Sequence, residues 1–408
     1  MRVCSVRSNG PEDEVDLTIT VGSTIAGRYC VIEQIGEGAF SRVFECNDQT
    51  YGKRVAVKVM RNDKACFDTG LGEIRVLSLL QREHGSEGRT PYGLLLDYFY
   101  YKEHLVLVLE RLDASLACIN TALGKDLTEY YQPSRLAFIA FQLLNTLQLV
   151  HGANVVHCDI KPQNVCFDSI SQCTVKLIDF GSCVCKHDVR NSYVQSRWYR
   201  APEVMLGMSY DEKIDVWGLG CVMAELLIGA PLFRGATVAQ VLAAQQAVLG
   251  PYPPSMISRL EEDAFKPYLR PDHSPYEIDP PGMPRGVYAL HPMPQSLSEV
   301  LPTDDELTLD FITSLLKHDP AERSTVEEAL RHPFISTNVK GSGRGGLYGP
   351  TSLVSKRAQP SLIEATPSPS PHSPSSTDTP SEQPPHIRCK SQWASQNRLG
   401  RVQAAKQG

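Results

Sequence analysis

Three polar residues with complementary chemistry, Asp159, Lys161 and Asn164, lie close together in the run HCDIKPQN. The carboxylate of Asp159 can accept or orient the proton of a substrate hydroxyl. Lys161 can neutralise a phosphoryl group, and the amide oxygen of Asn164 is a ligand that Mg²⁺ accepts. A polar turn without function could contain the same residues. Their order between two apolar segments nevertheless favours catalysis of phosphoryl transfer.

A further acidic residue, Asp179, follows the apolar strand-like run TVKLI and begins the triplet DFG. Its carboxylate is a hard oxygen ligand, which suits a Mg²⁺ ion that bridges phosphate oxygens. The triplet alone is a weak signal, but its place 15 residues after Asn164 strengthens it. We therefore interpret Asn164 and Asp179 as metal ligands.

A glycine-containing turn, GEGAFS at 36–41, separates two β-rich runs. Glycines let backbone amides approach phosphates closely, although two glycines in a hairpin are more often a simple turn. Ser41 stands where the usual pattern has a third glycine, which bears on the flexibility of the loop rather than on phosphate contact. The candidate ATP contacts here are Ile35, Gly36, Glu37, Gly38, Ala39, Phe40, Ser41, Arg42 and Val43.

One lysine, Lys58, lies in the apolar strand-like run VAVK, 20 residues after Gly38. An uncompensated buried charge is costly, so its ammonium group needs partners. We expect these to be ATP phosphates and Glu73 in the following helical segment. The alternative is a surface lysine whose stem alone is buried.

Three charged residues are assigned structural roles. Glu203, in the triplet APE, is expected to form a buried ion pair with Arg323 in the run HDPAERST. Asp215, in IDVWGLG, is expected to cap or brace the catalytic loop, and His157 is interpreted as a brace rather than a base. None of these roles involves contact with a reacting atom.

The elements that must position these residues change in kind along the chain. Up to Leu112, β-rich runs at 28–36, 42–48 and 54–60 and a strand pair around the turn at 102–103 predict about five strands, with one helix at 71–83. Beyond Leu112, apolar helical periodicity predicts helices at 134–152, 214–229 and 307–319. A proline-rich stretch at 251–302 reads as an insertion rather than a domain.

Composition is that of a globular protein, at 42% hydrophobic and 21% charged residues. The net charge is −6, yet the low-complexity tail from Ser336 carries nine Lys/Arg against three Asp/Glu. A basic tail can bind acidic partners, although a merely solvated tail is the commoner case. The twelve cysteines form no CxxC pair, and neither a signal segment nor a run of about 18 apolar residues is seen. We expect an intracellular protein of the cytoplasm or nucleus, with free thiols.

Together these motifs resemble those of eukaryotic protein kinases over residues 28–335. The runs HCDIKPQN, SYVQSRWYRAPEV and YDEKIDVWGLGCVMAELLIGAPLF resemble the dual-specificity tyrosine-regulated kinase (DYRK) family of the CMGC group. The runs IAGRYCVIEQIGEGAFSRV and DYFYYKEHLVLVLE look most like its plant- and protist-type branch. The resemblance implies an α+β, two-lobed kinase fold with ATP and Mg²⁺ between the lobes. It divides the chain into an extension at 1–28, a kinase domain at 29–335 with lobes at 29–112 and 113–335, and a disordered tail at 336–408.

The resemblance also implies roles for residues that spacing alone does not explain. Tyr193 matches the family's autophosphorylated tyrosine, with Arg197 and Arg200 placed to bind its phosphate. Asn191 replaces the first tyrosine of the family's usual pair, and Cys158 replaces the arginine of most kinases. Leu109 is the gatekeeper, the residue next to the adenine. The backbone of the hinge residues Glu110 and Leu112 would bind the adenine.

The resemblance implies phosphorylation of serine and threonine in proteins, with tyrosine only as the autophosphorylation target. We expect a monomer that acts on protein substrates and binds neither nucleic acid nor membrane. Three other interpretations remain open: a pseudokinase scaffold that binds ATP and partners without turnover, a docking module in the basic tail, and a kinase of arginine-serine-rich splicing factors from the same group.

Overall fold

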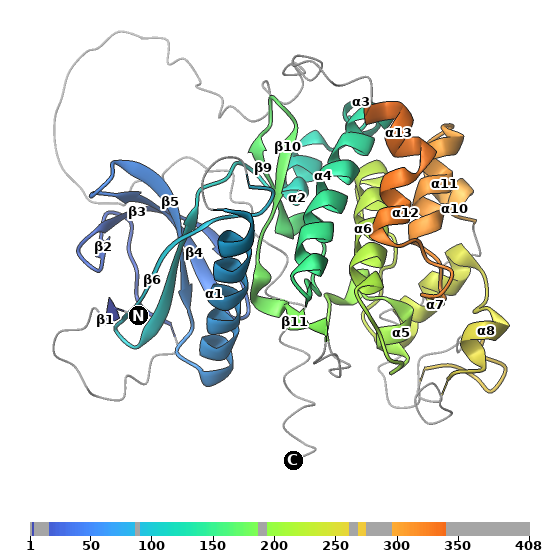
Figure 1. The fold of residues 1–408 in the computed structure, drawn as a ribbon, viewed down its shortest axis with the longest axis horizontal. Helices are drawn as coiled ribbons and strands as arrows, with labels where there is room; N and C mark the ends of the chain where they lie inside the picture. The colour runs from blue at the N-terminus through green and yellow to red at the C-terminus, as the bar shows by residue number, and fades with distance from the viewer. Residues whose placement is uncertain are drawn as a thin grey trace, which may run out of the picture.

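The computed structural model describes residues 2–3, 16–85, 90–186, 194–260, 268–274 and 296–339. Figure 1 shows a sheet with one long helix at one end of the molecule and a mainly helical part at the other. The predicted α+β, two-lobed architecture is confirmed by this arrangement. Tail residues 340–408 and residues 187–193 lie outside the described ranges.

The sheet of the N-lobe has the strand order β1-β6-β7-β5-β4-β3-β2. Five long strands carry it, and two two-residue strands extend its edges, so the prediction of about five strands omitted only the short ones. A tight turn joins β6 to β7, because Lys102 and Glu103 both adopt positive φ, as a two-residue hairpin turn requires. The bounds are Arg2–Val3 (β1), Thr24–Ile25 (β2), Tyr29–Glu37 (β3), Ser41–Asp48 (β4), Lys53–Met60 (β5), Leu95–Tyr101 (β6) and His104–Glu110 (β7).

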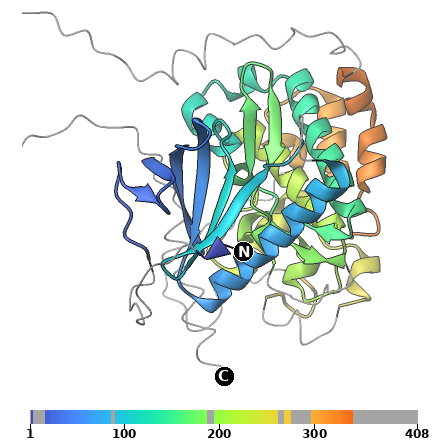
Figure 2. The ribbon, with the colours of Figure 1, turned by 60° about the vertical axis from the view of Figure 1, so that its left-hand side comes forward.

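Helix α1, Lys64–His84, is the long helix of the N-lobe, and Figure 2 shows it lying across the sheet. It begins seven residues before the predicted start because Asp63 caps it: its carboxylate accepts hydrogen bonds from the amides of Ala65 and Cys66. Its buried face carries Glu73 among apolar residues. The strand β5 and the helix α1 thereby bring Lys58 and Glu73 together.

The C-lobe is built around α4 (Pro133–Gly152), which buries about half of its residues, and α6 (Lys213–Ile228), which is almost wholly buried. The helix predicted at 307–319 ends earlier, as α11 at Glu306–Leu315. The other helices are α2 (Leu116–Leu123), α3 (Leu127–Tyr130), α5 (Pro202–Met205), α7 (Val238–Leu249), α8 (Pro254–Ile257), α10 (Leu297–Val300), α12 (Val326–Arg331) and α13 (Pro333–Val339). Two small sheets pair β9 (Val165–Ser169) with β10 (Thr174–Leu177), and β8 (Val155–Val156) with β11 (Val184–Cys185).

The hydrophobic core differs from the sequence prediction at the N-terminal side. The first 20 residues are polar, which by itself predicts a mobile segment, but among those that the structure describes, Leu17 is buried against β-sheet residues that include Ile25 and Phe44. Apolar contact outweighs the polar composition of its neighbours at this position. In the described ranges, no helix is both long and apolar enough to cross a membrane.

Candidate active site

Lys58 is the point where the two lobes meet through charge. Its Nζ lies 2.7 Å from Oε2 of Glu73 on α1 and 2.8 Å from Oδ1 of Asp179 in the C-lobe. Lys58 is 7% exposed, so its two carboxylate partners are needed to offset the desolvation of its ammonium group. Of these two partners, Glu73 was expected from the sequence and Asp179 was not. One lysine therefore holds a helix of the N-lobe and the DFG triplet in a single arrangement.

Burial and mutual attraction together shift the pKa values of the triad Lys58, Glu73 and Asp179. Burial works against charge on Lys58, but its two carboxylate partners prevail and raise the pKa of its ammonium group above the ordinary value. Burial raises the pKa of Glu73. Burial also opposes charge on Asp179, yet attraction to Lys58 and then to Lys161 holds its pKa well below the ordinary value. Asp179 is therefore ionised at neutral pH.

Four hydrogen bonds fix the carboxylate of Asp159, a residue that is 7% exposed. One oxygen, Oδ2, accepts from Lys161 Nζ at 2.5 Å and from Asn164 Nδ2 at 3.0 Å. The other, Oδ1, accepts from the hydroxyl of Ser196 at 2.7 Å and from its amide at 3.2 Å. The three residues predicted to be catalytic thus lie in one network, and Ser196 joins them from a distant segment.

The catalytic loop is braced by Asp215, which is completely buried on α6. Its two oxygens accept hydrogen bonds of 2.8 Å from the amides of His157 and Cys158, and His151 Nε2 lies 2.9 Å from Oδ2. These bonds hold Cys158 at a positive φ of 63°, which is unusual for a residue with a side chain. The bracing role expected of Asp215 is present in the structure.

His157 serves the loop as a neutral ring. Its Nδ1 accepts from the amide of Asp159 at 3.2 Å, and its Nε2 lies 3.2 Å from the carbonyl oxygen of Ile178. Burial lowers the pKa of His157, which favours a neutral ring. The tautomer with its proton on Nε2 satisfies both contacts, because Nε2 can then donate to Ile178 while Nδ1 accepts from Asp159. The ring also packs edge-on against Phe180 of the DFG triplet.

The loop at 35–43 and the residues after β7 lie at the lobe junction. Ile35 and Phe40 are about two-fifths exposed (41% and 40%), which is unusual for large apolar side chains and leaves them accessible to a ligand. Leu109 packs against the cores of both lobes. The backbone of Leu112 has no hydrogen bond partner within the described part of the chain, whereas the amide of Glu110 bonds to Leu94.

The activation segment, which runs from Asp179 to Glu203, is described at 179–186 and from Val194 onward, so the predicted autophosphorylation site Tyr193 lies outside the described residues. Arg200 donates from Nε to the carbonyl of Val194 and from Nη2 to that of Gln195, both at 2.7 Å. Arg197 donates to the carbonyl of Ala236. Both predicted phosphate-binding arginines thus lie in the same segment, each with backbone carbonyl contacts.

The expected pair of Glu203 and Arg323 is present and completely buried. Arg323 reaches both carboxylate oxygens with its two terminal nitrogens, at 2.6 and 2.9 Å. Such a fork-to-fork contact is among the stronger charge-assisted hydrogen bonds. It anchors the end of the activation segment to the segment before α12.

Sequence reasoning missed Ser196 and the pair of Tyr199 and Glu225. Tyr199 donates a 2.6 Å hydrogen bond to Glu225 of α6, and burial raises the pKa of that carboxyl to about 7. A charged residue in the middle of the apolar run CVMAELLIG was the available signal for Glu225. Nothing in the local sequence marks Ser196, because its partners lie more than 30 residues away.

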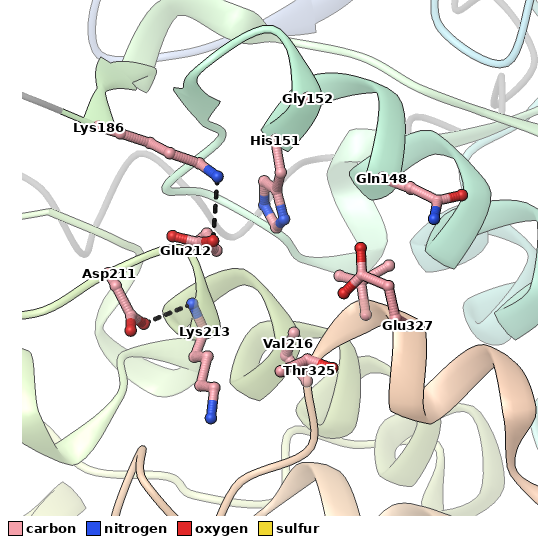
Figure 3. Close-up of a pocket in the computed structure, with 11 residues that line it drawn as sticks. Gln148, His151, Gly152, Lys186, Asp211, Glu212, Lys213, Val216, Thr325 and Glu327 are labelled. Carbon is pink, nitrogen blue, oxygen red and sulfur yellow. Dashed lines mark hydrogen bonds and ion pairs between the residues drawn. The ribbon is translucent and has the colours of Figure 1, made fainter.

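A separate cavity of about 310 Å³ lies in the C-lobe, away from Lys58 and Asp179. Figure 3 shows its lining, in which acidic and basic side chains alternate and Lys186 pairs with Glu212. Among the lining residues, His151 is linked to the catalytic loop through Asp215, which its Nε2 contacts. The remaining residues come from the ends of α4, α6 and α12.

Residues 29–335 match the protein kinase domain family. The chain is 34% identical to the DYRK-family kinase pom1 of Schizosaccharomyces pombe over 88% of its length and 32% of that protein. It is 32% identical to dual specificity tyrosine-phosphorylation-regulated kinase 2 of Drosophila melanogaster (82% of this chain, 45% of that protein) and 33% identical to kinase 4 of the same name in Homo sapiens (78% and 59%).

The chain thus spans about a third to three-fifths of these relatives' lengths. A solved crystal structure of a kinase domain, 26% identical, superposes with a TM-score of 0.67 over 79% of this chain and 99% of that one. The family match covers the residues that form the site above. The chain belongs to the protein kinase family, and the three relatives named above are DYRK kinases.

Proposed function

We propose that this protein transfers the γ-phosphoryl group of ATP to serine and threonine hydroxyls of protein substrates. The observation that carries the proposal is the double contact of Lys58 with Glu73 and Asp179. Phosphoryl transfer depends on positioning and charge neutralisation, and this contact assembles the parts for both from two lobes. The relatives named above, which include dual-specificity kinases, support the same activity.

The residues present fit ATP and a divalent cation. Asp179 keeps a side chain that is 38% exposed although it bonds to Lys58, so its carboxylate is accessible to an ion. Both hydrogen bonds of the Asn164 side chain use Nδ2, which leaves its amide oxygen to act as a ligand. Two oxygen ligands from protein and the rest from phosphates and water is the usual arrangement for Mg²⁺. Mg²⁺ would neutralise charge on the phosphates.

Adenine would bind at the backbone of Glu110 and Leu112, beside Leu109, with the loop at 35–43 over the phosphates. Gly36 supports this placement. A side chain there would meet only Val43 at an ordinary 3.5 Å, so packing within the protein does not demand glycine at this position. The close approach of a phosphate does explain it.

Asp159 would orient the acceptor hydroxyl and receive its proton. Its two oxygens are already fixed by Ser196 and by Lys161, so the carboxylate needs no rearrangement before reaction. Lys161 would then stabilise the charge that develops on the transferred group. Preorganisation of this kind lowers the barrier because the dipoles and charges are in place beforehand.

The test is phosphate transfer from ATP and Mg²⁺ to a basic, proline-containing peptide by wild type and Asp159→Asn. General acid–base groups contribute about 10²- to 10⁴-fold, so we expect a loss in that range. Arg54→Gln, which removes an exposed arginine of β5, is the matched control and should retain activity. Absence of transfer by folded wild type would instead support the pseudokinase alternative.

We further propose that the kinase phosphorylates its own Tyr193 once, in cis. The support is the segment that follows it: Arg200 donates to the carbonyl of Val194, and a guanidinium group suits a phosphate. Intact-mass analysis after expression should show one phosphate on wild type and none on Tyr193→Phe or Asp159→Asn. Phosphate on Tyr193 in the Asp159→Asn protein alone would contradict self-modification.

The splicing-factor kinase alternative concerns only the substrate. A peptide-library screen separates a preference for proline after the acceptor from a preference for arginine-serine repeats. The docking-module alternative for the tail is tested by deletion of residues 337–408. Unchanged phosphorylation of cellular substrates by the truncated kinase would exclude it.

A further inference from the structure

We propose that Arg61 is a positioning residue for the ATP-binding loop, and that Asp16 of the N-terminal extension acts through it. The two residues lie outside the strands that form the loop. Neither belongs to the motifs that specify phosphoryl transfer. The assignment rests on the proposed function, since it concerns how the loop at 36–41 is held for ATP.

Arg61 contacts the loop at three points. Its backbone amide donates to the carbonyl of Phe40 at 2.9 Å. Its Nη2 lies 3.4 Å from the carbonyl oxygen of Gly38 and 3.5 Å from Oε1 of Glu37. Across the loop itself, the amide of Gly38 donates to the carbonyl of Ser41 at 2.8 Å. Arg61 therefore bridges the base of the loop and its tip.

Asp16 holds Arg61 from the other side. Its Oδ2 lies 3.1 Å from Arg61 Nη1, and its Oδ1 lies 3.8 Å from Nε of Arg42. The two arginines lie at the adjoining ends of two paired strands, Arg42 near the start of β4 and Arg61 directly after the end of β5. The Asp16 carboxylate thus contacts residues at the adjoining ends of β4 and β5.

Leu17 explains why Asp16 stays in place. The side chain of Leu17 is 7% exposed and packs in the N-lobe core with Ile25 and Phe44. Its carbonyl also accepts a hydrogen bond from Arg42. Burial of the apolar Leu17 side chain fixes the backbone next to Asp16. The side chain of Asp16 is 40% exposed, and the position of its carboxylate therefore does not depend on its ion pairs alone.

The consequence is a loop whose carbonyls are held away from the phosphates. The carbonyls of Gly38 and Phe40 both accept hydrogen bonds from Arg61. Carbonyls held in this way do not turn toward a bound phosphate, whose negative charge would repel them, and loop amides other than that of Gly38 can face the ligand. The expected effect lies in ATP binding rather than in proton transfer, because Asp159 and its partners are in the other lobe.

The experiment compares Arg61→Gln, Asp16→Asn and the double variant with wild type. Partly exposed charge contacts and single hydrogen bonds lead us to expect a rise of about three- to tenfold in KM for ATP for Arg61→Gln, with kcat within about twofold of wild type. Asp16→Asn should show a smaller rise. The double variant should match Arg61→Gln, because a residue that acts through another adds nothing once that residue is gone. Arg61→Lys, which keeps the charge but not the fork, should restore part of the affinity.

Arg54→Gln is the control for loss of an arginine from the same strand region, since Arg54 pairs with Glu45 and not with the loop. Hydrogen exchange of peptides covering 36–41, measured without nucleotide, gives a readout independent of catalysis. We expect faster exchange there in Arg61→Gln and Asp16→Asn than in Arg54→Gln.

Exchange and KM at control values in Arg61→Gln would overturn the assignment, as would additive effects in the double variant. Wild type that neither binds ATP nor transfers phosphate would overturn the proposed function instead. The exchange measurement would still decide whether Arg61 and Asp16 hold the loop.

Discussion

The hydroxyl of Ser196 donates a 2.7 Å hydrogen bond to Oδ1 of Asp159, across 37 residues of sequence. The same hydroxyl oxygen accepts from Lys161 at 2.9 Å. Ser196 therefore connects the group expected to receive the proton with the group expected to neutralise the phosphate. It does so from the activation segment, which makes the order of that segment a condition for the geometry of the catalytic loop.

Substitution Ser196→Ala removes this connection and should lower kcat more than it raises KM for ATP. Hydrogen bonds to charged groups contribute about 1.5–3 kcal/mol, which corresponds to about a ten- to hundredfold loss in rate. Steady-state kinetics on a peptide substrate measures the effect. Ser196→Thr keeps the hydroxyl and should retain most of the activity. Equal losses in both variants would show that side-chain size, rather than the hydrogen bond, matters.

Substitution Arg323→Met should destabilise the C-lobe strongly. It leaves the carboxylate of Glu203 buried without its cation, and breaking one side of a buried ion pair costs about 3–5 kcal/mol. Urea unfolding gives the free energy of unfolding directly. The double replacement of Arg323 and Glu203 by methionine should recover part of that loss, since no lone charge remains. A loss as small as that of the exposed Arg54→Gln, about 1 kcal/mol or less, would contradict the prediction.

The buried carboxyl of Glu225 should make stability depend on pH. Burial raises its pKa from 4.5 to about 7, so between these values the folded protein binds more protons than the unfolded chain. The stabilising contribution is complete below pH 4.5 and is lost as pH rises through 7. The shift corresponds to about 3 kcal/mol.

Comparison of wild type with Glu225→Gln at pH 5 and pH 8 isolates this contribution. The glutamine can still accept the hydrogen bond from Tyr199, but it does not ionise. We expect the variant to gain stability relative to wild type as pH rises from 5 to 8, measured by urea unfolding. Parallel pH profiles for the two proteins would mean that Glu225 does not titrate in this range.

Two glycines of α6 separate packing from catalysis. A side-chain carbon at Gly218 would lie 2.9 Å from Cβ of Ile160 and 3.1 Å from its carbonyl oxygen, so Gly218→Ala should displace the catalytic loop and reduce kcat. A carbon at Gly220 would meet Leu316 at 2.8 Å, in the opposite direction. Gly220→Ala should therefore lower the melting temperature with little change in kcat. Indistinguishable kinetics for the two variants would exclude a specific effect on the loop.

The sequence alone determined the order and chemical types of the residues in the site. Asp159, Lys161 and Asn164 lie within one short loop, so their proximity follows from covalent connection, and apolar runs on either side predict the elements that carry them. The pattern of apolar residues likewise predicted the strand that carries Lys58 and the helix that carries Glu73. Helix starts were less accurate, because the cap at Asp63 outweighs the apolar pattern that begins later.

Only the tertiary structure decided which distant groups meet. Ser196 on Asp159, Tyr199 on Glu225, and Asp16 on Arg61 each join segments whose local sequences carry no mark of the partner. Leu17 shows the cause most clearly: its neighbours are polar and by themselves predict a mobile terminus, yet its side chain is buried in the N-lobe core. Contacts of this kind depend on the summed packing of the whole domain, which spacing along the chain does not encode.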